Sequence, residues 1–305
     1  MRFKMLATGL LTLGILVGLT GCGNEQKAQG DTKEKLVVQF VPTNNDGSME
    51  AKTKPFAAYL SKKLDKDVTV TLATDYSTIV EAMASGQVDV GIMPPAAYVQ
   101  AKDMDAAEAV LTSQLGAYDR KTGLPTDKLT NTFKGEILVK ADSNLKDLTD
   151  LKGKKIATLS PNSASGYIYP VAELKEAGVD PTKDATVTTV NDIPSEMTAV
   201  LNGQMDAAFV FEGARNVFAS KFSDQDIMKD LRVLYLTTGD IPNDAIAVQP
   251  KMDKKLKQEI KDVFLNMPKD EAGQEAMALW GHKGYQEAAD SAYDTIREYT
   301  KKASE

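Results

Sequence analysis

The sequence has very few of the residues on which most enzyme and metal chemistry depends, with one cysteine, Cys22, and one histidine, His282. A single cysteine cannot form a disulfide within the chain, and nucleophilic catalysis or zinc binding usually requires His or Cys beside other reactive groups. We interpret His282 as a surface or helix-capping residue. Neither phosphate-loop nor dinucleotide-binding glycine motifs occur. We therefore expect no metal, no cofactor and no catalytic residues, and a secreted hydrolase is the weaker alternative.

An excess of positive charge is also missing. The chain has 36 Lys and Arg against 43 Asp and Glu, for a formal net charge of -7. Proteins that bind nucleic acids need a basic surface to contact the phosphate backbone, so nucleic acid is excluded as the expected partner. A small anion is not excluded, because helix N-termini and backbone amides bind anions locally whatever the net charge.

The longest apolar run, at the N-terminus, is shorter than the roughly 20 residues of a membrane-spanning helix. It follows a basic start at Arg2 and Lys4, and we predict an export signal over residues 1–21. The run ends in Leu-Thr-Gly-Cys, which resembles the bacterial lipobox, so Cys22 is expected to carry a lipid that holds the protein at a membrane. Residues 22–35 are polar and predict a flexible tether. We expect an extracytoplasmic, lipid-anchored protein.

From Leu36 onward, short apolar runs alternate with helical patterns, which predicts an α/β protein with a mostly parallel sheet and helices on its faces. The region after Asp253 is expected to be helical, with breaks at Pro268 and 281–284. The expected strands are 36–41, 68–73, 88–93, 133–140, 155–159, 185–190, 205–211, 231–236 and 245–248, and the other helices are 48–64, 77–85, one from Pro95, 166–177 and 195–202.

An internal repeat organises these elements. Residues 81–92 and 198–209 each combine the end of a helix, a glycine, two polar residues and a buried strand. Chance similarity is the alternative, but the surrounding elements repeat in the same order. Two copies of one α/β unit predict two similar lobes. Ligands bind at the carboxyl ends of strands in such sheets, so polar residues that follow the strands are candidates for the site.

Two such polar segments lie between a strand and a helix. Residues 160–167, Ser-Pro-Asn-Ser-Ala-Ser-Gly-Tyr, provide hydroxyls, a glycine and a helix N-terminus, all of which can donate to an anion. Residues 74–78, Thr-Asp-Tyr-Ser-Thr, are their counterpart in the first lobe, where we assign Asp75 to capping. Ordinary N-caps with adjacent turns are the alternative interpretation of both segments.

These residues resemble the phosphonate-binding (PhnD-type) branch of periplasmic solute-binding proteins. The resemblance rests on Asp75-Tyr76, on Gly86 with Asp89, on residues 163–167, and on Asp-Leu-Lys-Gly-Lys at 150–154, and it extends over essentially the whole chain from Leu36. It implies a type II periplasmic-binding-protein fold, with lobe 1 formed by 36–132 plus 244–305 and lobe 2 by 133–243. It also implies a phosphorus-oxyanion site that contains Tyr76, Ser77, Thr78, Ser163, Ala164, Ser165, Gly166 and Tyr167.

The chain departs from the family at Ala164, where Thr is common, and at Phe133, where a ligand-contacting Tyr is common. Glu212 and Asp244 resemble positions at which carboxylates meet the ligand's substituent. A carboxylate near an anion needs a cation or proton between them, so it would meet either a ligand amine or a protonated oxyanion. Solvated acids at loop ends are the remaining alternative.

The expected function is that of the solute-binding component of an ABC importer, a monomer that delivers a phosphonate or related phosphorus oxyanion to a permease and ATPase complex. The alternative cargoes on the same fold are a sulfonate, a thiamine-pyrimidine precursor and phosphate.

Overall fold

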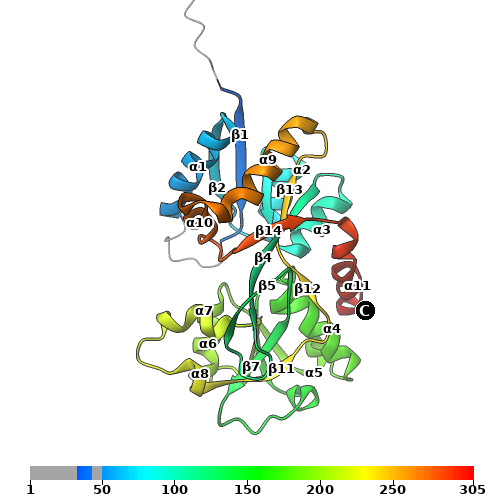
Figure 1. The fold of residues 1–305 in the computed structure, drawn as a ribbon. Helices are drawn as coiled ribbons and strands as arrows, with labels where there is room; N and C mark the ends of the chain where they lie inside the picture. Colours follow the sequence, from blue (N-terminus) through cyan, green and yellow to red (C-terminus); the bar gives the residue numbers. More distant parts are fainter. Residues whose placement is uncertain (1–32, 43–49) are drawn as a thin grey trace, which may run out of the picture. The chain divides into compact units, whose positions relative to one another are not determined.

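The computed structural model of the protein describes residues 33–42 and 50–305. Residues 33–305 form one compact unit. The expected export signal, Cys22, most of the tether and the start of the first helix lie outside the described residues. Figure 1 shows the described part as two groups of strands with helices around them.

The first sheet has the order β14-β4-β13-β3-β1-β2, and β5 pairs with β4. Strands β1, β2 and β3 are parallel to one another, whereas β13 is antiparallel to β3 and β4, and β14 and β5 are antiparallel to β4. The strands are β1 (Lys35–Phe40), β2 (Asp67–Leu72), β3 (Val90–Met93), β4 (Glu108–Tyr118), β5 (Pro125–Thr130), β13 (Ala245–Val248) and β14 (Gly284–Glu287).

The second sheet has the order β11-β7-β10-β8-β9. Strands β8, β9 and β10 are parallel, and β7 is antiparallel to β10 and β11. The strands are β7 (Gly135–Lys140), β8 (Lys155–Thr158), β9 (Thr186–Thr189), β10 (Ala207–Phe211) and β11 (Leu231–Leu236). Two short strands, β6 (Thr132–Phe133) and β12 (Ile241–Pro242), pair where the chain passes between the two sheets (Figure 1).

Helices cover both sheets (Figure 1). The α-helices are α1 (Glu50–Leu64), α2 (Tyr76–Ala84), α3 (Pro95–Asp103), α4 (Tyr169–Glu176), α5 (Pro181–Asp184), α6 (Ile193–Leu201), α7 (Ala214–Phe218), α8 (Ile227–Asp230), α9 (Lys254–Asn266), α10 (Glu271–Met277) and α11 (Asp294–Ser304). A π-helical turn, η2 (Ala164–Ile168), precedes α4, and the short 3₁₀ segments are Leu148–Leu151, Ala219–Lys221, Met267–Lys269 and Asp290–Tyr293.

The expectation of a mostly parallel sheet is wrong, because both sheets are mixed. Strands β4, β13 and β14 enter the first sheet antiparallel to their neighbours, and β7 does so in the second. The expectation of a purely helical C-terminal region is also wrong, since β14 forms there as an edge strand on β4. Its sequence, Gly-Tyr-Gln-Glu, has no strand pattern of its own, and pairing with β4 supplies its hydrogen bonds. The sequence patterns also did not predict β4 and β5.

The repeat is confirmed at the level of individual hydrogen bonds. Gly86 and Gly203 both end their helices with positive φ values, of 71° and 69°. In each copy the following aspartate, Asp89 or Asp206, accepts a hydrogen bond of 2.8 Å from a backbone N–H of the adjacent parallel strand. Asp75 and Asp192 cap the two helices in the same way. The two units therefore place their helix N-termini alike, at the carboxyl ends of their strands.

One apolar cluster joins the two sets of elements. It contains Ile79 of α2 and Tyr98 of α3, beside the first sheet, together with Ala164, Ile168 and Tyr169, which follow β8 of the second sheet. Helix α11 contacts both α3 and α4. The segments that carry the two polar motifs of the sequence thus pack into a single core.

Candidate functional site

The serine-rich loop begins where β8 ends and leads into the π-helical turn η2. Ser163 is buried, and its hydroxyl accepts a hydrogen bond of 3.1 Å from the backbone N–H of Gly166. A Cβ on Gly166 would lie 2.8 Å from Leu159, so the loop closes this tightly only because the residue is glycine. Ala164 and Ser165, between them, are also buried. The N–H groups of this turn form the start of the helix, where anions bind favourably.

The first-lobe motif forms the N-terminus of α2. Asp75 is the N-cap and accepts from the backbone N–H of Thr78 at 2.8 Å, which confirms its capping role. The Thr78 hydroxyl also donates to Asp75, at 3.0 Å, and contacts the Thr74 hydroxyl. Ser77 is exposed. The Thr78 hydroxyl, which was predicted to bind the ligand, is therefore already hydrogen-bonded to the residue that caps the helix.

Tyr76 connects the two motifs. Its side chain lies near that of Ser163, although the two residues belong to helices beside different sheets. Burial raises the pKa of Tyr76, and the nearby carboxylate of Asp244 raises it further, so the phenol stays protonated at neutral pH. Phe133 and Tyr167 pack against the same apolar cluster as Tyr76. The structure thus brings together Tyr76, the serine loop, Phe133, Tyr167 and Asp244.

The interpretation of His282 as a surface or capping residue is wrong, because its ring is buried and contacts Asp244. The Nε2 atom of His282 lies 3.3 Å from Oδ2 of Asp244, and Nδ1 lies 3.2 Å from the Tyr285 hydroxyl, which accepts from the indole N–H of Trp280 at 3.4 Å. Burial lowers the pKa of His282, and Asp244 only partly opposes this, so the ring is neutral. A neutral ring satisfies every contact when Tyr285 donates to Nδ1 and Nε2–H donates to Asp244.

We expect the buried ring to make folding sensitive to acid. Because the pKa of His282 is lower in the folded protein, the unfolded chain binds more protons below about pH 6.5. Its contribution to stability is complete above that pH and is lost as the pH falls towards the folded pKa. Chemical denaturation between pH 5 and 7.5 should show a steeper decline in stability for the wild type than for His282→Gln. Equal slopes would show that the ring does not titrate between the two states.

Glu212 lies in a different environment from Asp244. Its Oε2 accepts from the backbone N–H of Lys134 at 3.1 Å, and burial raises its pKa while Arg120 and Lys134 oppose the rise. The ring of Tyr118 lies against Gly213, where a Cβ would approach it to 2.1 Å. Tyr118 has its own pKa raised by burial and by nearby carboxylates, Glu212 among them. Glu212 therefore faces the end of β4.

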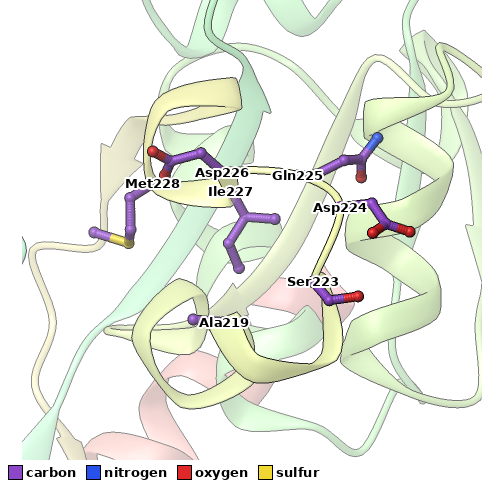
Figure 2. Close-up of a pocket in the computed structure, with 7 residues that line it drawn as sticks. All are labelled: Ala219, Ser223, Asp224, Gln225, Asp226, Ile227 and Met228. Atoms are coloured by element: carbon purple, nitrogen blue, oxygen red, sulfur yellow. The ribbon is translucent and has the colours of Figure 1, made fainter.

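A surface depression lies elsewhere on the molecule, between the 3₁₀ segment Ala219–Lys221 and α8. Figure 2 shows the residues that line it, which include the acids Asp224 and Asp226 but no lysine or arginine. Asp226 is paired with Lys229 at 2.8 Å. An acidic depression is unsuited to an oxyanion. In the part of the chain that the structure describes, no cluster of three or more metal-ligating side chains occurs, and no helix is long and apolar enough to cross a membrane.

Sequence reasoning missed two buried residues, namely His282, which contacts Asp244, and Glu196. No local pattern marks His282, because its partner Asp244 is distant along the chain. Glu196 did leave a signal. It shares the buried face of α6 with Ile193, Met197 and Val200, so a carboxyl group lies on an otherwise apolar helix face.

A family model and two named proteins are similar to this chain. Residues 38–293 match the family model described as "ABC transporter, phosphonate, periplasmic substrate-binding protein". The phosphate-import protein PhnD of Mycolicibacterium smegmatis is 28% identical over 219 residues, which are 68% of this chain and 65% of that protein. The alignment therefore spans just under two thirds of that relative. The phosphonates-binding periplasmic protein of Escherichia coli is 23% identical over 295 residues, or 95% of this chain and 81% of that one.

Solved structures show the same fold. A binding protein component of an ABC phosphonate transporter from Pseudomonas aeruginosa has a TM-score of 0.72 at 19% identity, covering 89% of this chain and 88% of its own. PhnD1 of Prochlorococcus marinus, in complex with methylphosphonate, has a TM-score of 0.70 at 20% identity, covering 89% and 98%. The predicted type II periplasmic-binding-protein fold is confirmed. Because the family model matches most of the sequence, this chain belongs to the family of periplasmic substrate-binding proteins of phosphonate ABC transporters.

Proposed function

We propose that this protein is the extracytoplasmic solute-binding component of an ABC importer and that it captures a phosphonate or a related phosphorus oxyanion. The observation that carries the proposal is the proximity of Tyr76, at the N-terminus of α2, to Ser163, at the N-terminus of η2. It brings together two helix N-termini that each follow the carboxyl end of a strand, β2 before α2 and β8 before η2. Donors from both sets of elements therefore converge at one place.

The ligand would bind mainly to neutral donors. The hydroxyls of Tyr76, Ser163 and Ser165 and the N–H groups of Ala164 and Ser165 would donate to its oxygens, and the helix ends would favour its negative charge. Ala164 contributes its amide but no hydroxyl. We propose that residues 36–132 plus 244–305 form lobe 1 and residues 133–243 form lobe 2, and that the lobes close on the ligand.

The choice of ligand rests on both relatives and residues. One relative is named for phosphate import, one for phosphonates, and one structure contains methylphosphonate. Phe133 and Tyr167 pack against the same apolar cluster as Tyr76 and would give the site an apolar side, which favours an organic substituent. Asp244 would face that substituent, with His282 holding its carboxylate in place. A sulfonate or a thiamine-pyrimidine precursor on the same fold remains the alternative cargo.

Calorimetry on the purified protein tests this function. The panel would contain 2-aminoethylphosphonate, ethylphosphonate, methylphosphonate, phosphite, phosphate, a sulfonate and a thiamine precursor. We expect saturable binding of at least one phosphorus oxyanion. Tighter binding of 2-aminoethylphosphonate than of ethylphosphonate would assign the acids to a ligand amine, whereas a preference for phosphite would assign them to a protonated oxyanion. Binding of only the sulfonate or thiamine precursor would contradict the proposal.

We also propose that the protein acts as a monomer without catalytic activity, passes its ligand to a permease and ATPase complex, and is held at the membrane through a lipid on Cys22. Replacing Cys22 with alanine should move the protein from the membrane fraction to the soluble fraction, because acyl chains on the N-terminus would supply the anchor. Fractionation followed by immunoblotting measures this. An unchanged membrane fraction in Cys22→Ala would contradict the anchor.

A further inference from the structure

Glu196 is an anomaly in the second copy of the repeat, where it lies in the core on helix α6. Its side chain has no exposed surface, and neither carboxyl oxygen has a hydrogen-bond partner within the described residues. Burying a carboxyl group without partners costs several kcal/mol relative to an apolar side chain. The fold therefore retains a costly group at this position.

The repeat shows that packing does not require an acid here. The N-caps Asp75 and Asp192 occupy corresponding positions, and counting four residues onward from each reaches Ile79 in α2 and Glu196 in α6. Ile79 is fully buried in an apolar cluster. An isoleucine thus fills in the first unit the place that a glutamate fills in the second.

The location of Glu196 points to the proposed ligand. It lies in the first turn of α6, after the carboxyl end of β9, and β9 pairs in parallel with β8, whose carboxyl end leads into the serine loop. An ionised carboxylate at Glu196 would also be near enough to raise the pKa of Tyr76. An acid without partners therefore lies at the strand ends that carry the proposed anion donors.

A buried carboxyl group that is protonated can donate a hydrogen bond to an anion. Burial, together with the negative charge of Asp192, raises the pKa of Glu196 well above its usual range, which favours the neutral carboxylic acid. A neutral carboxyl group has one O–H donor, whereas an ionised one can only accept and would repel an anion.

We propose that Glu196 contacts the bound ligand as a protonated carboxyl group and donates a hydrogen bond to an oxygen of the oxyanion. This inference rests on the function proposed above and adds a donor at a position where the first unit has only a hydrocarbon. The protonated carboxyl group would favour ligands that present an unprotonated oxygen towards α6.

Three variants test the role by measuring affinity and stability together. Glu196→Gln keeps a neutral donor, so its dissociation constant should stay within about threefold of wild type. Glu196→Ile copies the first unit, so it should bind about 10- to 100-fold more weakly, the loss expected for a hydrogen bond to a charged group. It should unfold at the same or a higher temperature, because an apolar side chain replaces a buried acid. Met197→Leu, on the same helix face, is the control and should bind as wild type does.

The outcomes separate this inference from the proposed function. If the wild type binds a phosphorus oxyanion and Glu196→Ile binds it equally well, the acid is not a ligand contact and the inference is overturned. If Glu196→Gln is as weak as Glu196→Ile, neutral donation is wrong. If the wild type binds no oxyanion in the calorimetric panel, the proposed function itself fails and the ligand role of Glu196 fails with it. Weaker binding in Glu196→Ile without loss of stability supports the inference.

Discussion

Replacing Ser163 with alanine is expected to weaken binding of the phosphorus oxyanion about 10- to 100-fold. The substitution removes a hydrogen bond to a charged group, worth about 1.5–3 kcal/mol. It also removes the acceptor for the Gly166 N–H. Titration calorimetry with the best ligand of the panel measures the change.

A matched control separates the site from the general effect of removing a hydroxyl. Ser143 also accepts a local backbone hydrogen bond, from Leu145 at 3.3 Å, but it follows β7, which is antiparallel to β10 and so ends at the opposite edge of the second sheet. Ser143→Ala should bind as wild type does. Ser165→Ala should resemble Ser163→Ala in binding. Wild-type affinity in both loop variants would show that the oxyanion binds elsewhere.

The largest loss of stability is expected for Glu173→Ala. Glu173 is buried in α4, and its carboxylate accepts from the backbone N–H groups of Thr238 and Gly239 and from the hydroxyls of Tyr235, Thr238 and Tyr299. Alanine would leave several of these donors without a partner, so we expect a loss of about 3–5 kcal/mol in the free energy of unfolding. Chemical denaturation measures it.

The same residue predicts a dependence on acid. Burial alone would raise the pKa of Glu173, but its five donor groups outweigh burial and lower the pKa below the usual 4.5. The stabilisation is therefore complete above about pH 4.5 and is lost as the pH falls through the folded pKa. Glu176→Ala is the control, because that carboxylate lies on the same helix in an exposed pair with Lys302 and should cost at most about 1 kcal/mol. Equal losses in the two variants would contradict the central role of Glu173.

Glu173 also shows how the segments around the site are held. Its donors come from β11, from the residues after it and from α11, and Tyr299 of α11 stacks on Tyr169 of α4 with ring centroids 3.9 Å apart. The neighbouring turn η2 carries the serine loop. A polar group with all its partners and a stacked aromatic pair therefore hold the helix that positions the proposed anion donors.

The amino-acid sequence by itself determined the elements whose signals are local. The repeat specified helix ends at Gly86 and Gly203, because glycine readily adopts positive φ, and Asp75 is a cap because its side chain reaches the N–H of Thr78 within the same turn. The serine loop was visible for the same reason, since its residues are consecutive and follow a buried strand.

The tertiary structure decided what depends on distant partners. Strand β14 exists because β4 is beside it, and His282 is buried because Asp244, 38 residues away, accepts from its ring. Glu196 stands between these cases. The sequence placed an acid on an apolar helix face, but only folding determined that Tyr76 would lie near it, because burial and electrostatic fields depend on distances in space rather than on separation along the chain.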